Sequence, residues 1–348
     1  MIRIEKKIMD ELGSSTNIED LHFWVQKAIE LEHSTIPPYL TAAFSIPDGE
    51  SVFVKEALMD IAKEEMLHFM IGCNLLLSLG GQPKIYFKEF IPNYPCPLPM
   101  SINSLTVGLE KASKNVIEKV FMEIEEPEKP IDFPVIEVSF LKDKIHYEFA
   151  TIGQFYNLIK EKINQLDNFP GEIANQITNE SVSPFQENLF PIRTKEDAIK
   201  AIDIIVEQGE GTTQLPTFGT NHSLAHYYRF KQIVKGKKLI EDKTTPKGYS
   251  YSGTIIEFDE NKMYPLYPNL KINDLQDGDE KDLLMKFNKQ YSKMLLALDN
   301  AFKGVAGEYN KSIKAMRNLT IFARTVVSTK HPTKQNFNIS PTFEFVEL

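Results

Sequence analysis

The stretch LMDIAKEEMLHFMIGCNLLLSL, residues 58–79, places two ionisable side chains inside an apolar helical stripe. Positions three and four residues apart share one face of a helix, and this face is apolar from Leu58 to Leu75 with two exceptions. The exceptions are Glu65 and His68. Because a buried charge without a partner is strongly destabilising, this pair needs partners on other helices. A Glu-x-x-His pair in this phase can place a carboxylate and an imidazole on one metal ion inside a helix bundle.

The sequence around this stretch predicts a mainly helical protein. A helix over 17–43 precedes it, and the pair Pro37-Pro38 is expected to kink or interrupt that helix because proline lacks a backbone donor. Ser51 is the expected cap of the next helix, which ends near Gly80 and forms an antiparallel hairpin with the first. Further helices are expected over 104–125, 155–166, 195–208, 221–235, 280–303 and 308–327, with ordered loop over 82–100 and short strands over 135–140 and 254–258.

Three other predicted helices carry side chains that could complete a metal site. Glu32 lies on the apolar face of the first helix. Glu210 continues the apolar stripe of the helix over 195–208, and Glu207 lies one turn before it, where a solvated position is an equally good interpretation. His226 lies on the apolar row of the helix over 221–235, whereas His222 either caps that helix or supports a ligand from behind. Four helices with inward carboxylates or imidazoles match a di-iron or di-manganese carboxylate bundle.

Composition excludes several classes of protein. The chain has only two cysteines, Cys73 and Cys96, which is too few for a disulfide framework or a thiolate metal site, and a reducing cytoplasm is the expected location. A net charge of −9 argues against a surface for nucleic acid or anionic membrane. No apolar run reaches the ~18 residues of a membrane span, and the first residues contain no secretory apolar segment.

Several stretches resemble the ferritin-like family of iminophenyl-pyruvate dimer synthase-type proteins, which includes a domain of the violacein-pathway enzyme. The main ones are AIELEHSTIPPYLTAAFSI (28–46), IAKEEMLHFMIGCNLLLSLGGQP (61–83), IVEQGEGT (205–212) and LAHYYRF (224–230). The resemblance continues through YPCPLP, FMEIEEPE, FNKQYSKMLLALDNAF and SPTFEF, so it covers nearly the whole chain. It implies a mainly α, ferritin-like four-helix bundle with a dinuclear metal site, long loop-rich inserts and additional C-terminal helices.

The resemblance also implies a domain layout and a ligand set. The chain, 1–348, is expected to be one elaborated ferritin-like domain, with its bundle core at about 17–81 and 195–235, inserts at 82–194 and 236–282, and C-terminal helices at 283–327. Carried over by position, the metal ligands are Glu32, Glu65, His68, Glu207, Glu210 and His226. The family pattern would place a glutamate three residues before His226, and this sequence has Ser223 there. A carboxylate is then missing, unless Glu207 or Glu210 replaces it.

The expected function is a metal-dependent oxidoreductase with a non-haem di-iron centre. It would use dioxygen or peroxide to oxidise a small, amino-acid-derived molecule, such as an imine in secondary metabolism. Iron, with one or two ions per chain, is the expected cofactor and manganese the alternative, because carboxylate and imidazole ligands suit both. Tyr39, Tyr227 and Arg229 either line this site or only pack and form a surface ion pair, and the inserts are expected to wall a substrate pocket.

Two other functions remain open on the sequence. One is a non-catalytic metal-binding or scaffolding protein, which Ser223 favours. The other is an iron-storage cage, whose assembly the long inserts would obstruct. The expected partner is a small-molecule substrate, with no nucleic acid and no membrane, and the chain is expected to be a monomer or a small homo-oligomer rather than a storage cage.

Overall fold

The computed structural model describes residues 4–100, 105–127, 130–131, 150–178, 188–209, 215–218 and 223–348. These residues are mainly helical, as the sequence predicts. The longer helices are α1 (Lys6–Ser14), α2 (Ile18–Phe44), α3 (Val52–Ser78), α6 (Ile152–Gln165), α7 (Lys195–Gly209), α8 (His226–Lys235), α9 (Asp279–Phe302) and α10 (Glu308–Ser328). The shorter ones are η1 (Lys88–Phe90), α4 (Lys114–Val116), η2 (Ile117–Phe121), α5 (Met122–Ile124), η5 (Glu260–Lys262) and η6 (Ile272–Asp274).

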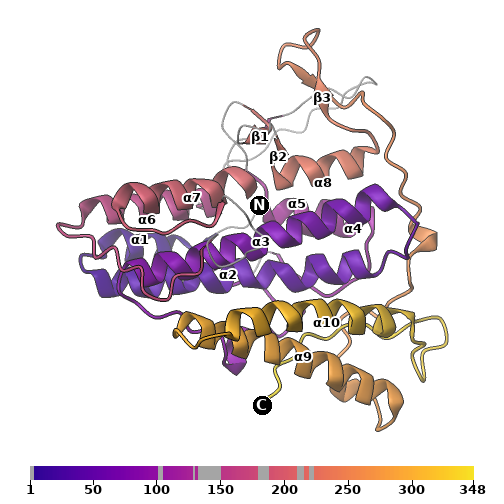
Figure 1. Cartoon of the computed structure of the whole chain (residues 1–348). Coiled ribbons are helices and arrows are strands. Elements are labelled where there is room, and N and C mark those ends of the chain that lie inside the picture. The colour runs from indigo at the N-terminus through magenta and orange to yellow at the C-terminus, as the bar shows by residue number, and fades with distance from the viewer. Residues whose placement is uncertain are drawn as a thin grey trace.

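The helices form three layers around the antiparallel pair α2 and α3, which lies in the middle (Figure 1). The pair α9 and α10 covers one face of this central pair. The other face is covered by α6 and α7 at one end and by α8 with the α4–α5 segment at the other. Buried apolar side chains of all three layers form one continuous core. The central pair is therefore buried on both faces, which is why polar side chains on it require partners.

The sequence predicts that Pro37 and Pro38 kink or interrupt helix α2. The structure shows no interruption, because the helix continues through both prolines. Asn17 caps the start of the helix through its side chain. Pro38 has no N–H to donate to the Ser34 carbonyl four residues earlier. The hydroxyl of Tyr94 donates to that carbonyl instead, at 2.6 Å. A hydrogen bond from a distant loop thus replaces the one that proline removes.

The helix predicted over 104–125 begins ten residues later than expected, at Lys114. Before it, the chain is extended, and Val107 and Cys96 exchange two backbone hydrogen bonds of 2.9 and 3.0 Å. Ser113 then caps α4 through its side chain. The helix continues through a π-helical stretch, η2, and α5 ends immediately before Glu125. Such π-helical turns are common where a helix presents functional residues.

The helix predicted over 221–235 begins at His226, because the residues before it form a hairpin instead. Strand β2 (Ser223–Leu224) pairs antiparallel with β1 (Thr217–Phe218). A second small hairpin joins β3 (Ile240–Glu241) to β4 (Tyr249–Ser250). The strand predicted over 254–258 is reduced to a single bridge between Ile255 and Lys237, and the one predicted over 135–140 lies outside the described residues.

The remaining predicted elements agree closely with the structure. Helix α3 starts directly after Ser51, but the Ser51 side chain makes no capping hydrogen bond. Helix α6 starts three residues earlier than expected, where Thr151 and Gln154 form a capping box. No helix in the described part of the chain combines the length and apolar character that a membrane span requires.

Candidate metal centre

Two groups of buried acidic and histidine side chains lie next to each other between α2, α3, the end of α5 and the start of α8. Glu32, Glu65 and His68 form the first group, and Glu65, Glu125 and His226 form the second. In each group the potential ligand atoms lie within 4.8 Å of one another. Glu65 belongs to both groups, so the five side chains form one continuous cluster with a shared carboxylate at its centre.

Both imidazoles present the same nitrogen to this cluster. The Nδ1 atom of His68 lies 3.5 Å from Glu32 Oε2 and 3.8 Å from Glu65 Oε1. The Nδ1 atom of His226 lies 2.9 Å from the same Glu65 oxygen and 3.5 Å from Glu125 Oε2. The two rings stack with their centroids 5.5 Å apart. Glu65 Oε1 thus lies between two inward-facing imidazole nitrogens.

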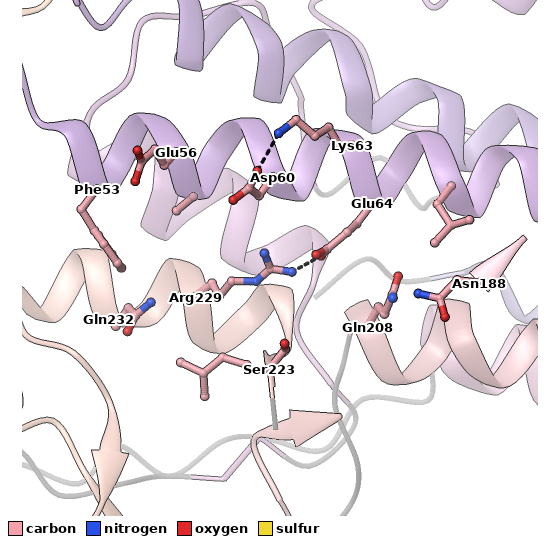
Figure 2. A pocket seen from close by; sticks show the side chains of 13 residues that line it. Phe53, Glu56, Asp60, Lys63, Glu64, Asn188, Gln208, Ser223, Arg229 and Gln232 are labelled. Atoms are coloured by element: carbon pink, nitrogen blue, oxygen red, sulfur yellow. Dashed lines mark hydrogen bonds and ion pairs between the residues drawn. The ribbon is translucent and has the colours of Figure 1, made fainter. Parts of the chain in front are cut away.

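The opposite ring nitrogens are held from behind. His68 Nε2 is 2.9 Å from Gln208 Oε1 of α7, and His226 Nε2 is 2.7 Å from Glu64 Oε2 of α3. Arg229 of α8 forms an ion pair with the same Glu64 carboxylate, and Figure 2 shows the two side chains pointing toward one another. Because Gln208 Oε1 and Glu64 Oε2 accept the Nε2 protons, Nδ1 is the nitrogen of each ring that a metal ion would bind in exchange for a proton. Metal-bound histidines are typically oriented in this way.

Each carboxylate is held through one oxygen and presents the other to the imidazoles. A buried hydroxyl donates to the outer oxygen in all three cases, which fixes the carboxylate's orientation. The donor and acceptor pairs are Tyr156 OH to Glu32 Oε1 at 2.5 Å, Thr35 Oγ1 to Glu65 Oε2 at 2.9 Å and Tyr39 OH to Glu125 Oε1 at 2.6 Å. The inner oxygens, Glu32 Oε2, Glu65 Oε1 and Glu125 Oε2, are those that lie near the Nδ1 atoms.

Burial and mutual repulsion perturb the proton affinities of these groups. Burial, and after it the charge of Glu125, raises the pKa of Glu65 to about 7 against the lowering effect of His226 and His68. Burial alone would lower the pKa of His226, but hydrogen bonds and charges from Glu125 and Glu65 outweigh it and raise this pKa to about 10. The pKa of His68 is also raised, by Glu32 and Glu65 against the effect of burial. Protons therefore occupy the cluster where a cation could replace them.

The donor atoms of the cluster suit metal ions, and each of its two groups could hold one. Carboxylate oxygens and imidazole nitrogens are ligands that iron and manganese accept, and neither cysteine belongs to the cluster. A cavity of about 30 Å³ adjoins Glu32, Glu65, His68 and Glu125, which is enough for a water-sized occupant but not for an organic substrate. Gly209 also lines this cavity and leaves room for the Glu125 carboxylate, because a Cβ atom at this position would lie 3.2 Å from Glu125 Oε2.

A model of the ferritin-like family matches residues 25–235, more than half of the chain. The chain belongs to the ferritin-like family. The matched region contains all five side chains of the cluster and both α2 and α3 almost completely. The family expected from the sequence motifs is therefore confirmed.

Two relatives and one solved structure are similar to this ferritin-like chain. Dichlorochromopyrrolate synthase of Lentzea aerocolonigenes is 22% identical over 339 residues, which cover 82% of this chain and 31% of the relative. The 2-imino-3-(indol-3-yl)propanoate dimerase of Chromobacterium violaceum is 24% identical over 247 residues, covering 60% of this chain and 22% of the relative. The chain thus spans less than a third of either relative's length.

The solved structure supports the fold. A ferritin-like protein of Caulobacter vibrioides superposes with a TM-score of 0.55 at 19% identity, and the match covers 89% of this chain and 96% of that one. The helical bundle with its extra C-terminal helices is therefore a ferritin-like architecture over most of its length.

The structure brings together four of the six ligands expected from the ferritin-like pattern. Glu32, Glu65, His68 and His226 all belong to the cluster. Glu207 is exposed on α7, and the next residue, Gln208, turns inward to His68 instead. Glu210 and His222 lie outside the described residues.

Sequence reasoning missed Glu125, which supplies the carboxylate of the second group. It lies in the segment assigned to an insert, directly after α5. A signal was present, because Glu125 follows Ile117 and Phe121 at steps of four and both of these are buried. An acidic residue at the end of such an apolar row is the same kind of signal that identified Glu65.

Ser223 does not lie at the helical position that the family pattern gives to residue 223. Ser223 is an exposed residue of strand β2 and not part of α8, so it does not lie one helical turn before His226. A carboxylate that could take this role is that of Glu125, on another segment, which lies in the cluster with His226. Of the neighbouring side chains, Tyr39 contacts the cluster directly through Glu125, whereas Tyr227 packs edge-on against Tyr228.

Proposed function

We propose that this ferritin-like chain holds two iron ions and oxidises a small, amino-acid-derived substrate with dioxygen or peroxide. The observation that carries the proposal is the position of Glu65, which two groups of ligands share, with one inward-facing imidazole in each group. Glu32 and His68 would hold one ion, Glu125 and His226 the other, and Glu65 would bridge them. Manganese suits the same donors and is the alternative metal.

When bound, the two ions would supply the stepwise electron transfer that reduction of dioxygen or peroxide requires. The residues of this chain fix the ligands and exclude bulk water. Burial raises the pKa values of Tyr39 and Tyr156 well above the usual range, and the carboxylates they contact add to this effect, so both phenols stay protonated and keep donating to Glu125 and Glu32. Their hydrogen bonds hold the carboxylates before any ion arrives, which reduces the cost of organising the site.

A cleft behind the imidazoles offers room for the substrate. It has a volume of about 570 Å³ and is lined by Glu64, Gln208 and Arg229, the side chains that support the two histidines (Figure 2). A molecule bound there would lie one side chain away from the ligands His68 and His226. Binding could then act on the centre by changing how Glu64 or Gln208 holds its imidazole.

The class of substrate comes from the relatives. The name of one of them, 2-imino-3-(indol-3-yl)propanoate dimerase, states an imine derived from an amino acid, and that of the other states synthesis of a dichlorochromopyrrolate. We propose an imino acid with an aromatic side chain for this chain too. A non-catalytic metal-binding scaffold is the alternative, and it is less well supported if Glu125 offers the carboxylate that Ser223 cannot.

The test combines metal content with turnover. Protein loaded anaerobically with two equivalents of ferrous iron is mixed with oxygenated buffer and an imino acid generated in place from tryptophan by an amino-acid oxidase with catalase. Beyond the oxygen that the amino-acid oxidase consumes without this chain, we expect uptake that depends on both iron and the imino acid and is lost in Glu65→Ala. Glu207→Gln is the matched control, because Glu207 is exposed and outside the cluster. Binding of iron without any reaction with oxygen or peroxide would contradict the proposal.

A further inference from the structure

A second cavity lies on the face of the α2–α3 pair that is turned away from the metal centre. It has a volume of about 290 Å³ and is lined by residues of α2, α3, α9 and α10. Apolar side chains line most of it, and five methionines contribute from three helices. They are Met59, Met66 and Met70 of α3, Met294 of α9 and Met316 of α10. Methionine side chains adapt their shape to a ligand and make favourable contacts with aromatic rings through sulfur.

Aromatic rings and one buried polar pair complete the inner wall. Phe44 and Phe69 line the cavity together with Tyr291, which is 2% exposed. The hydroxyl of Tyr291 is 2.5 Å from Nε2 of His33, a side chain that is 3% exposed and also lines the cavity. The lining therefore combines flat apolar surfaces with a few polar groups, which is typical of small-molecule sites.

The charged residues of the lining are all cationic. Lys63 and Arg317 line the cavity, and the described lining contains no aspartate or glutamate. Arg317 is exposed, and Lys63 is 60% exposed and paired with Asp60 at 2.8 Å. Exposed cations of a mostly apolar cavity lie where it opens to solvent. An anionic group at the mouth would be attracted there, whereas a cationic one would be repelled.

We propose that this cavity is a binding site for an aromatic carboxylate, with the ring between the methionines and the carboxylate at Arg317 and Lys63. The volume is at the lower end of the ~300–1,000 Å³ usual for ligand sites, so it fits one fused ring system rather than two. An empty apolar cavity lowers the stability of a protein in proportion to its volume. A ligand that fills this one should therefore raise the stability of the whole chain.

The second site does not depend on the metal centre. Helices α2 and α3 separate the two, although three candidate ligands are adjacent in sequence to residues that line the cavity. These pairs are Glu32 and His33, Glu65 and Met66, and His68 and Phe69. A molecule in the second cavity cannot contact the metal ligands Glu65 and His68, which face the other layer. Its role would be to hold or sense an aromatic acid rather than to transform it.

Titration calorimetry with indole-3-propionate tests this site on the metal-free full chain. We expect one molecule bound per chain, and at least roughly tenfold weaker binding of tryptamine, which has the same ring but carries a cation. Arg317→Gln should weaken binding of the carboxylate roughly five- to tenfold. Arg324→Gln is the matched control, because Arg324 is exposed on the same helix and does not line the cavity.

A cavity-filling variant locates the ligand. Met316→Trp should abolish binding, while Glu65→Ala, which removes a candidate metal ligand on the opposite face of the α2–α3 pair, should leave it unchanged. Absence of saturable binding to the wild-type chain would overturn the proposal, as would full binding to Met316→Trp or equal affinity for tryptamine. Stronger binding of dodecanoate than of indole-3-propionate would overturn the aromatic class. Should Met316→Trp fail to fold, Arg317→Gln replaces it as the test. Weaker binding of indole-3-propionate by this variant would support the proposal, and unchanged binding would overturn it.

Discussion

Replacing Glu125 by glutamine separates the two metal positions. Glu125 belongs to only one ligand group, whereas Glu65 belongs to both. We therefore expect two ions in the wild type, one in Glu125→Gln and none in Glu65→Gln. In the wild type, the Tyr39 hydroxyl donates a hydrogen bond of 2.6 Å to Glu125 Oε1. The amide oxygen of a glutamine at position 125 can accept the same hydrogen bond, so the metal-free variant should fold normally.

The effect on thermal stability follows from mass action. An ion that binds only the folded chain, at a free concentration one hundred times its Kd, stabilises it by about 2.7 kcal/mol. A chain of 348 residues has an unfolding entropy on the order of 0.7 kcal/mol/K, so each ion should raise Tm by about 4 °C. The wild type should gain about 8 °C on loading, Glu125→Gln about half of that, and Glu65→Gln almost nothing.

The assay is differential scanning calorimetry with and without ferrous iron under anaerobic conditions, together with metal analysis of the desalted protein. Glu207→Gln is the control, since Glu207 was expected from the sequence to be a ligand but is exposed on α7. It should bind two ions and gain the full shift. Retention of both ions by Glu125→Gln, or loss of one by Glu207→Gln, would refute the assignment of the second group.

Three further predictions test the surroundings of the centre. Iron affinity should rise with pH, because bound iron replaces protons held below pH 10 by His226 and below pH 7 by Glu65. Competition titrations should show that the affinity rises about tenfold per pH unit between pH 7 and 9 and more steeply below pH 7. An affinity that does not change with pH would contradict this competition between protons and iron. Glu64→Gln removes the negative charge behind His226 Nε2. It should weaken one of the two iron-binding steps by about 10- to 100-fold with the stoichiometry unchanged. If neither step is weakened, Glu64 does not support His226 as a ligand. Tyr94→Phe leaves the Ser34 carbonyl without its hydroxyl donor. It should lower the free energy of unfolding, measured by chemical denaturation, by about 1–3 kcal/mol. An unchanged free energy would mean that the helix does not need this hydrogen bond in place of the one that Pro38 removes.

The parts of the fold that could be predicted are those with long, regular patterns. Helices α2 and α3 carry continuous apolar rows, and both were expected to within a few residues of their observed bounds. Glu65 and His68 could be recognised because they interrupt such a row. The effect of the proline pair could not be predicted, because the Tyr94 hydroxyl that compensates for it comes from a loop far along the chain.

The candidate site was predicted incompletely because part of it depends on tertiary contacts. The phase of α7 differs from the expected row of Ile199, Ile202, Val206 and Glu210. Its buried residues are Ala198, Ala201, Ile202, Ile205, Gln208 and Gly209, so Gln208 faces inward and Glu207 outward. The apolar row of Ile117 and Phe121 indicated that Glu125 faces inward, but nothing in this segment indicates that it packs against His226 of α8. The hairpin of β1 and β2 delays the start of α8 and thereby removes Ser223 from the helix.

The most direct test of the central claim is anomalous diffraction at the iron edge from crystals of the chain loaded anaerobically with ferrous iron. Two peaks are predicted, one between Glu32 and His68 and the other between Glu125 and His226, with the Glu65 carboxylate between them. The imidazole nitrogen nearest each peak should be Nδ1, since Nε2 of each ring is held by Gln208 or Glu64. A single peak, or a peak beside Glu207 with none at Glu125, would contradict the account.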